Sequence, residues 1–261
     1  MDRPNNFLTT PMAILLSSFV ISIAILMHGG VIKIGKTITA QPVAQPSQPA
    51  AQPQAPKVTL DTIKALFNDK NLVFGNKNAK NLLVEVADPS CPYCHIAGGH
   101  NSALNKQVGP QFTLVSDGGS YIPPVPEMKK LVDEGKAAFV YIYTPGHGNG
   151  EMGTKALYCA NEKGKFWQVH DKLMSADGYD LLNNQIKNDK SKSGDLSNFL
   201  SDIFNSTDMK ACLDSGKYDT KLQDDIATAS KLGVSGTPGF YINTTNFAGA
   251  YSWKDMQSAV Q

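Results

Sequence analysis

The sequence predicts an α/β fold in which a helical subdomain is inserted between two of the strands. Three observations lead to this prediction. Short apolar runs have the length of buried strands, and a stretch of about ninety residues between the second and third runs has helical periodicity. The composition, with 41% hydrophobic and 18% charged residues, is ordinary for a globular chain of 261 residues. It excludes a chain that is disordered throughout and a small disulfide-stabilised miniprotein.

The first 57 residues differ in character from the rest of the chain. Residues 11–32 contain no formally charged side chain and have the length of a helix of about 33 Å, enough to cross the hydrocarbon core of a bilayer. No small-residue cleavage pattern follows directly after Met27, which favours an uncleaved signal anchor over residues 1–35. The alternative is a removable signal peptide that is cleaved further along the chain.

A linker and one folded domain follow this segment. Residues 41–56, QPVAQPSQPAAQPQAP, have too few apolar side chains for a core, and their prolines favour extended conformers, so residues 36–57 are predicted to be a semi-stiff tether. Residues 58–261 are suited to a single domain, with the helical insertion at about residues 146–232.

The strands of the domain are short and end at turn residues. Residues 82–87 (LLVEVA) stop at Asp88-Pro89, and residues 138–143 (AFVYIY) stop before Pro145-Gly146. A third strand at 240–242 is expected to pair with residues 247–251 across a polar turn.

Helical periodicity is found mainly in the insertion and at the C-terminus. The predicted helices cover residues 152–162, 166–174, 196–204, 209–215, 218–232 and 253–260. Residues 95–107 are also compatible with a helix despite Gly98 and Gly99, and residues 75–81 and 116–126 are expected to be loops.

The charge balance gives no indication of a nucleic-acid partner. The formal net charge is +1, with 24 basic and 23 acidic residues. A chain this close to neutral has no broad electrostatic surface for phosphates.

The motif that carries chemistry is Cys91-Pro92-Tyr93-Cys94, directly after the first buried strand. At a helix N-terminus the two sulfurs share one face and can bond to each other, and Pro92 suits the first turn. Unpaired backbone N–H groups and the positive end of the helix dipole favour a thiolate at an exposed first sulfur. Cys91 is therefore the predicted nucleophile and Cys94 the resolving thiol.

Three other interpretations of the motif are weaker. A structural disulfide across so short a loop constrains the unfolded chain little. A zinc site needs a second Cys/His pair, and the remaining cysteines have no such spacing, so no metal is expected. With His95 the motif also matches the haem-attachment pattern C-x-x-C-H, but its position after a buried strand favours redox thiols and no cofactor.

Further downstream, Gly233-Val-Ser-Gly-Thr237-Pro238 precedes the late strand. Together with Asp88-Pro-Ser-Cys91-Pro-Tyr-Cys94, the helical pattern at 156–167 and Cys212-Leu-Asp-Ser-Gly216, this segment resembles the DsbA-like thiol:disulfide oxidoreductases of the thioredoxin superfamily. The resemblance extends over about residues 90–243. It implies a thioredoxin fold, in which helices flank a central mixed β-sheet, and a cis Thr237–Pro238 bond opposite the cysteines.

The resemblance also implies roles for individual residues. Pro92, Tyr93, Thr237 and Pro238 are expected to contact the substrate, with the exposed backbone at Thr237 pairing strand to strand. Glu85 interrupts an apolar run and lies at the offset where the family has an acidic residue, so it is expected to handle the proton of Cys94. Tyr93 stands where the best-known oxidases have His, which predicts a milder oxidant.

Four cysteines allow three pairings, and a redox pair at Cys91 and Cys94 leaves Cys159 with Cys212. A structural disulfide is preferred there over two buried free thiols, because oxidase chemistry requires an oxidising compartment. The same argument places the domain on the extracytoplasmic side of a membrane. The charges on the two sides of the apolar segment do not decide this orientation by themselves.

The sequence thus predicts a single-pass, membrane-tethered thiol oxidase. Its expected partners are reduced cysteine-containing secreted proteins and a membrane quinone-linked reoxidase. A disulfide isomerase or reductase of the same fold and a non-catalytic thioredoxin-like binding module are the alternatives. His95 is expected either to meet the Cys91 sulfur or to be an exposed helix residue, whereas His100, His147 and His170 are expected in surface or capping roles.

Overall fold

The structure is a computed structural model that describes residues 58–261. The predicted signal anchor (1–35) and linker (36–57) lie outside the described residues. Within the described part of the chain, no helix combines the length and the apolar character needed to cross a bilayer.

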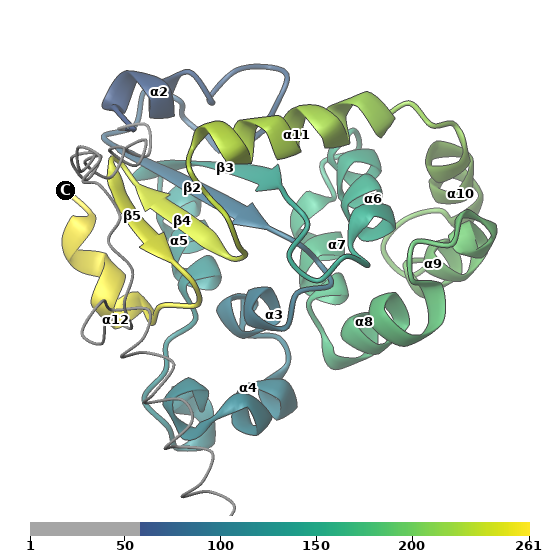
Figure 1. Cartoon of the computed structure of the whole chain (residues 1–261), viewed down its shortest axis with the longest axis horizontal. Helices are drawn as coiled ribbons and strands as arrows, with labels where there is room; N and C mark the ends of the chain where they lie inside the picture. Colours follow the sequence, from purple (N-terminus) through teal and green to yellow (C-terminus); the bar gives the residue numbers. More distant parts are fainter. Residues whose placement is uncertain (1–57) are drawn as a thin grey trace, which may run out of the picture. The chain divides into compact units, whose positions relative to one another are not determined.

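A five-stranded mixed sheet organises the described residues (Figure 1). Its strand order is β1-β3-β2-β4-β5; β2 and β3 are parallel, and the other neighbours are antiparallel. The strands are β1 (Leu72–Gly75), β2 (Asn81–Ala87), β3 (Ala137–Tyr143), β4 (Gly239–Ile242) and β5 (Thr245–Ala248). Every residue of β2, β3 and β4 is buried, which explains their apolar runs. The predicted α/β class with a mixed sheet is confirmed.

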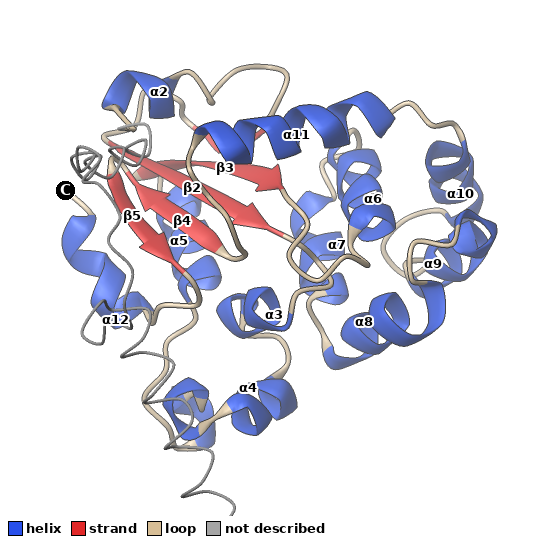
Figure 2. Ribbon diagram, in the orientation of Figure 1, coloured by secondary structure: helices blue, strands red, loops and turns tan. Residues whose placement is uncertain are grey.

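Helices cover both faces of this sheet (Figure 2). Val84 and Val86 of β2 belong to an apolar cluster with α2 (Leu60–Lys64) and α11 (Asp219–Lys231). Leu83 and Ala87 point to the opposite face, as strand alternation requires. The cluster on that face includes side chains of α3 (Pro92–Gly98), α5 (Pro124–Asp133), α7 (Phe166–Leu173) and α12 (Trp253–Met256). Glu85 has the same parity as Leu83, so it faces α3 and α7.

The chain between β3 and β4 is helical. It forms α6 (Glu151–Asn161), α7, α8 (Ala176–Asp180), a π-helical segment η3 (Leu181–Ile186), a short 3₁₀ turn η4 (Lys190–Lys192), α9 (Ser193–Phe199), α10 (Ser206–Asp214) and α11. Elsewhere, α4 (Ser102–Val108) precedes the 3₁₀ turns η1 (Pro110–Phe112) and η2 (Val115–Asp117), and η5 (Gln257–Ala259) follows α12.

Residues 95–107 are not one helix. α3 ends at Gly98, and Gly99 takes a left-handed conformation with φ 74°. A Cβ on Gly99 would lie 2.4 Å from Cγ of Pro123, so packing as well as backbone angle requires glycine there. α4 then begins anew, with the Asn101 side chain accepting the Leu104 N–H at 3.1 Å.

Other elements also differ from the sequence prediction, in their presence or in their bounds. Short elements β1 and α2 were not predicted, because four or five residues carry too little periodicity. α5 begins at Pro124, within the expected loop. β5 begins at Thr245 instead of residue 247, because left-handed Asn243 (φ 55°) tightens the turn and its Oδ1 accepts the Leu82 N–H at 3.0 Å.

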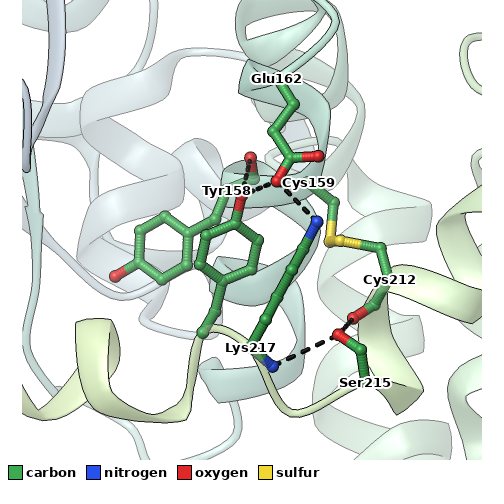
Figure 3. The surroundings of a disulfide bond; sticks show 7 residues. Tyr158, Cys159, Glu162, Cys212, Ser215 and Lys217 are labelled. Carbon is green, nitrogen blue, oxygen red and sulfur yellow. Dashed lines mark hydrogen bonds and ion pairs between the residues drawn. A yellow bond between two sulfur atoms is a disulfide. The ribbon is translucent and has the colours of Figure 1, made fainter.

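A disulfide between Cys159 of α6 and Cys212 of α10 ties two helices of the insertion together (Figure 3). This is the pair that the sequence analysis assigns to a structural disulfide. The cysteines are 53 residues apart, and closing a loop of that length in the unfolded chain stabilises the fold by about 4 kcal/mol in the chain-entropy view. Beside it, Glu162 accepts hydrogen bonds from Lys217 Nζ at 2.6 Å and from the Tyr218 hydroxyl.

Candidate active site

The Cys91 motif lies where β2 passes into α3. Cys91 is the N-cap of α3 and Pro92 is its first residue, as predicted. The backbone N–H groups of Cys94 and His95 donate to the Cys91 carbonyl at 3.0 and 3.2 Å. Both Cys91 and Cys94 are present as free thiols. Cys91 is only 4% exposed, so the expectation of an exposed first sulfur is wrong: the segment before β4 covers it.

The covering segment contains the cis Thr237–Pro238 bond that the family resemblance implies. β4 starts at Gly239, which pairs with Val86 near the end of β2, and this register brings the two segments together. The Cys91 thiol donates to the Thr237 carbonyl at 3.3 Å, across 146 residues of sequence. The site therefore consists of one local motif and one distant loop.

The surroundings of Cys91 favour its thiolate. A hydrogen bond from the Cys94 thiol is the largest influence, and it outweighs burial to lower the pKa of Cys91 to about 6. Thr237 and the backbone N–H groups of Cys94 and Tyr93 also lower this pKa. The Thr237 hydroxyl has no other hydrogen-bond partner within residues 58–261, so it is free to donate to the thiolate.

Cys94 has the opposite character. Burial, followed by its hydrogen bond to Cys91, raises the pKa of Cys94 well above its usual range. Its Sγ accepts only a long contact, 3.5 Å, from the Asp88 N–H. At neutral pH Cys94 therefore keeps its proton and donates a hydrogen bond to the Cys91 thiolate. This suits Cys91 as the nucleophile and Cys94 as the resolving thiol.

The rim of the site is formed by Tyr93 and the loop before β4. Tyr93 is 44% exposed, and its ring meets Phe112 edge-on with centroids 5.9 Å apart. Residues 233–239 line a shallow groove together with Asn246, Ala248 and Gly249 of the β5 region. Thr237 and Pro238 line this groove, although Pro238 is buried, whereas half-buried Pro92 and exposed Tyr93 follow Cys91 in the chain.

Asp88 is a site residue that the sequence analysis missed. Its Oδ2 accepts the backbone N–H groups of Gly146, His147 and Gly148 at 2.8, 2.9 and 3.3 Å. Its Oδ1 accepts both the N–H and the hydroxyl of Ser90 at 2.7 Å. The signal was present, because Asp88 and Pro145-Gly146 end neighbouring parallel strands, which finish at the same edge of a sheet.

Glu85 lies in the core on the face of the sheet that carries Cys94. It is 1% exposed, and neither carboxyl oxygen has a hydrogen-bond partner within the described residues. Burial raises the pKa of Glu85 to about 7, while the charge of His170 acts to lower it. The electrostatic interaction of Glu85 with Cys94 raises the Cys94 pKa in turn. This arrangement suits a group that exchanges a proton near neutral pH.

Neither expectation for His95 is correct. The ring is fully buried, with Nδ1 2.9 Å from the Met174 carbonyl and Nε2 2.8 Å from the Pro89 carbonyl. Burial lowers its pKa to about 4. The neutral ring donates its single N–H to one of these carbonyls, and its other nitrogen is enclosed against the second carbonyl, so neither nitrogen is open to the axial position that the haem interpretation requires. His170, expected at the surface, is also fully buried because α7 turns it towards the sheet.

Comparison with known proteins identifies the fold family. Residues 126–261, a little more than half of the chain, match the Thioredoxin_4 family model, described as thioredoxin. Among solved structures, oxidised BdbD of Bacillus subtilis is 18% identical, with 73% of this chain and 91% of that chain covered and a TM-score of 0.54. α-DsbA1 of Wolbachia pipientis is 17% identical, with 76% of this chain and 94% of that chain covered and a TM-score of 0.56. These similarities show a shared DsbA-like fold.

A curated protein with sequence similarity is much longer. The Na(+)/H(+) antiporter NhaA 3 of Salinispora tropica is 25% identical over 205 residues, which cover 77% of this chain and 26% of the antiporter. The chain therefore spans about a quarter of the length of the curated relatives it matches.

The buried Glu85 predicts a pH-dependent stability. Its pKa is raised in the folded state, so the folded chain binds a proton that the unfolded chain has lost between about pH 4.5 and 7. The stabilisation of the fold by this bound proton is fully present below pH 4.5. It is lost as the pH rises to about 7, which lowers the free energy of unfolding by about 3 kcal/mol. Glu85→Gln should therefore raise the free energy of unfolding at pH 8 and change it little at pH 4.5. Urea unfolding at the two pH values measures this, and equal effects at both would contradict the assignment.

Proposed function

This chain belongs to the Thioredoxin_4 family, and on that premise we propose that it is a thiol:disulfide oxidase that introduces disulfides into secreted or envelope proteins. The single observation that carries the proposal is the different placement of the two sulfurs within the DsbA-like fold. Cys91 is the N-cap of α3 and lies 3.3 Å from the Thr237 carbonyl, whereas Cys94 is fully enclosed in the core. The pKa of Cys91 is accordingly lowered and that of Cys94 raised. A stabilised Cys91 thiolate stabilises the reduced protein, and this makes its disulfide an oxidant.

The reaction begins from the Cys91–Cys94 disulfide. A substrate thiolate attacks Cys91 Sγ, the bond between the two site sulfurs breaks, and Cys94 leaves with the electron pair and takes a proton. The product is a mixed disulfide between the substrate and Cys91. A second substrate thiolate then attacks the substrate sulfur of that bond, closes the substrate disulfide and releases the Cys91 thiolate. The substrate loses two electrons and the Cys91–Cys94 pair gains them.

Substrate contact is proposed at the rim around Cys91. Tyr93 offers an exposed aromatic face at the mouth of the site. The loop at Thr237 and the groove beside it run along the start of β4 and the end of β5, where an extended peptide can lie beside the chain. An isomerase or reductase would use the same residues, and the redox state of the pair at equilibrium distinguishes it from an oxidase.

We further propose that the domain works on the extracytoplasmic side of a membrane, with residues 1–35 as a single-pass anchor and 36–57 as the tether. The apolar run at 11–32 and the Gln/Pro-rich segment support the anchor and the tether. The Cys159–Cys212 disulfide supports an oxidising compartment. Reoxidation of Cys91 and Cys94 by a quinone-linked membrane protein completes the proposed cycle.

Removal of the resolving thiol should trap the intermediate. In Cys94→Ala, Cys91 can attack a disulfide-bonded peptide but cannot be freed by Cys94, so a Cys91–peptide mixed disulfide should accumulate. Cys91→Ser should form none and lose all turnover of a dithiol peptide. Mass spectrometry after acid quenching detects the adduct. If Cys91→Ser still turned over the dithiol peptide, or formed an adduct at Cys94, Cys91 would not be the nucleophile.

The proposed orientation is tested in intact cells. Cys91 of the Cys94→Ala variant should react with a charged maleimide that does not cross membranes, because its thiolate lies on the outer side. The doubly substituted Cys91→Ser, Cys94→Ala chain is the matched control and should stay unlabelled. Labelling that appears only after the cells are lysed would place the domain on the cytoplasmic side.

A further inference from the structure

The turn between β2 and α3 sets the backbone of the nucleophile, and each carbonyl of this turn is engaged. The Asp88 carbonyl accepts the Cys91 N–H at 2.9 Å, and the Pro89 carbonyl lies 2.8 Å from Nε2 of His95. The Cys91 carbonyl accepts N–H groups of α3. These contacts are made within the turn and the start of α3. The Ser90 carbonyl is the exception, because its partner comes from the helical insertion, 93 residues further along the chain.

This partner is the side-chain amide of Asn183, which is only 9% exposed. Its Nδ2 donates to the Ser90 carbonyl at 3.0 Å and to the Tyr179 carbonyl at 3.1 Å. Its Oδ1 accepts a hydrogen bond from Nδ2 of Asn149 at 3.2 Å. Both amide hydrogens and the amide oxygen are therefore used, which fixes the orientation of the side chain.

Asn183 reaches the turn from a helix that is wider than an α-helix. In η3 the Lys187 N–H donates to the Leu182 carbonyl, five residues back, at 3.0 Å. The wider turn lets three consecutive residues face the interior, namely Leu181, Leu182 and Asn183. The helix ends in two left-handed residues, Lys187 (φ 48°) and Asn188 (φ 60°). π-Helical turns and left-handed residues other than glycine are uncommon, and both are concentrated at functional sites.

The end of η3 also holds the loop between β3 and α6. Asn188 donates from Nδ2 to the Gly148 carbonyl of this loop at 2.8 Å. Asp88 holds the same loop from the other side through three N–H groups. Gly146 packs so closely on the Thr237 hydroxyl that a Cβ there would overlap it. The helical insertion thus supports the loop on which Thr237 rests.

The peptide group between Ser90 and Cys91 is held at both ends. Asn183 binds its carbonyl, and the Asp88 carbonyl accepts its N–H. Because a peptide group is planar, holding both ends limits rotation about the next bond, which is the φ angle of Cys91 (−76°). Among the described residues, Cys91 makes no side-chain capping hydrogen bond to α3. The direction of its side chain therefore follows from the main chain.

We propose that Asn183 is a positioning residue for the reaction: by holding the Ser90 carbonyl, it fixes the backbone of Cys91 and keeps its sulfur at the start of α3, beside the Thr237 carbonyl. The role rests on the proposed function and deepens it, because it gives the helical insertion a part in the reactivity of the nucleophile. Asn183 acts through the Ser90 carbonyl and not on the sulfur itself.

Loosening this peptide group should make the Cys91 thiolate less stable. The Cys94 thiol contributes most to the lowered pKa of Cys91, and the backbone N–H groups of Cys94 and Tyr93 add to it. Hydrogen bonds of this kind weaken when the sulfur moves. The titratable side chains that interact with Cys91 are Cys94 of α3 and Tyr179 of α8. Within residues 58–261, Asn183 is hydrogen-bonded to the side chain of neither, so its removal acts on the backbone.

The pH profile of Cys91 alkylation tests the role. Reduced full-length chain is treated with iodoacetamide across a series of pH values, and modification of Cys91 is followed by mass spectrometry. Asn183→Ala should raise the midpoint of the profile by about half a pH unit, because the thiolate loses part of its hydrogen bonding. The rate at high pH should change by less than about twofold, because the nucleophilicity of a thiolate depends only weakly on its pKa.

Two matched variants separate positioning from a general loss of stability. Asn184→Ala removes the exposed amide next in the same helix, which donates to Asp180 at 2.6 Å. Ser197→Ala removes a buried hydrogen bond to the Ser193 carbonyl within α9. Both should keep the midpoint of the unmodified chain, even where urea unfolding shows that Ser197→Ala lowers the free energy of unfolding as much as Asn183→Ala does.

Asn149→Ala tests the same role with a milder change. It removes the donor that holds the amide oxygen of Asn183, so it should shift the midpoint in the same direction but by less. Adding Asn149→Ala to Asn183→Ala should shift the midpoint no further, because the Asn149 side chain acts through Asn183.

An unchanged midpoint in Asn183→Ala would overturn the role, as would an equal shift in Asn184→Ala or Ser197→Ala. If Asn183→Ala does not fold, an unchanged midpoint in Asn149→Ala overturns it. If Cys91 of the unmodified chain titrates as an ordinary thiol, with a pKa of about 8.5, the proposed function fails instead.

Discussion

The meeting of two distant segments at one edge of the sheet is the constraint on which the site depends. Val86 of β2 pairs with Gly239 of β4, and this register sets the Thr237 carbonyl 3.3 Å from the Cys91 sulfur. Asp88 adds the third segment by accepting the N–H groups of residues 146–148. In this arrangement the first sulfur, at the start of α3, is favoured as a thiolate, and the second is held protonated in the core.

The chemistry of the second sulfur explains why the core contains polar groups. A thiol buried as deeply as Cys94 ionises only if a neighbouring group takes its proton. Glu85 comes from β2, is equally buried and has no hydrogen-bond partner among residues 58–261. The carboxyl group that weakens the core is therefore the one expected to exchange the proton of Cys94, a trade between stability and function.

The predictable part of the protein is its local chemistry. Cys91-Pro92-Tyr93-Cys94 after a buried strand indicates both the helix start and the redox pair, because capping and strand burial act over a few neighbouring residues. The arrangements that depend on distant residues were not predictable. Asp88 finds its partners 58 to 60 residues away, and His95 is held by Met174, 79 residues away. His170 has a helical position that is equally compatible with the surface, and only the packing of α7 on the sheet decides its burial.

The reduction potential of the Cys91–Cys94 pair tests the central claim, that the stabilised Cys91 thiolate makes this protein an oxidant, most directly. The full-length chain is equilibrated in glutathione buffers of graded composition, and the fraction of the pair that is oxidised is measured by alkylation and mass spectrometry. We expect a potential between about −120 and −180 mV, with Tyr93 favouring the less oxidising end of that range. A value near that of thioredoxin, about −270 mV, would contradict it.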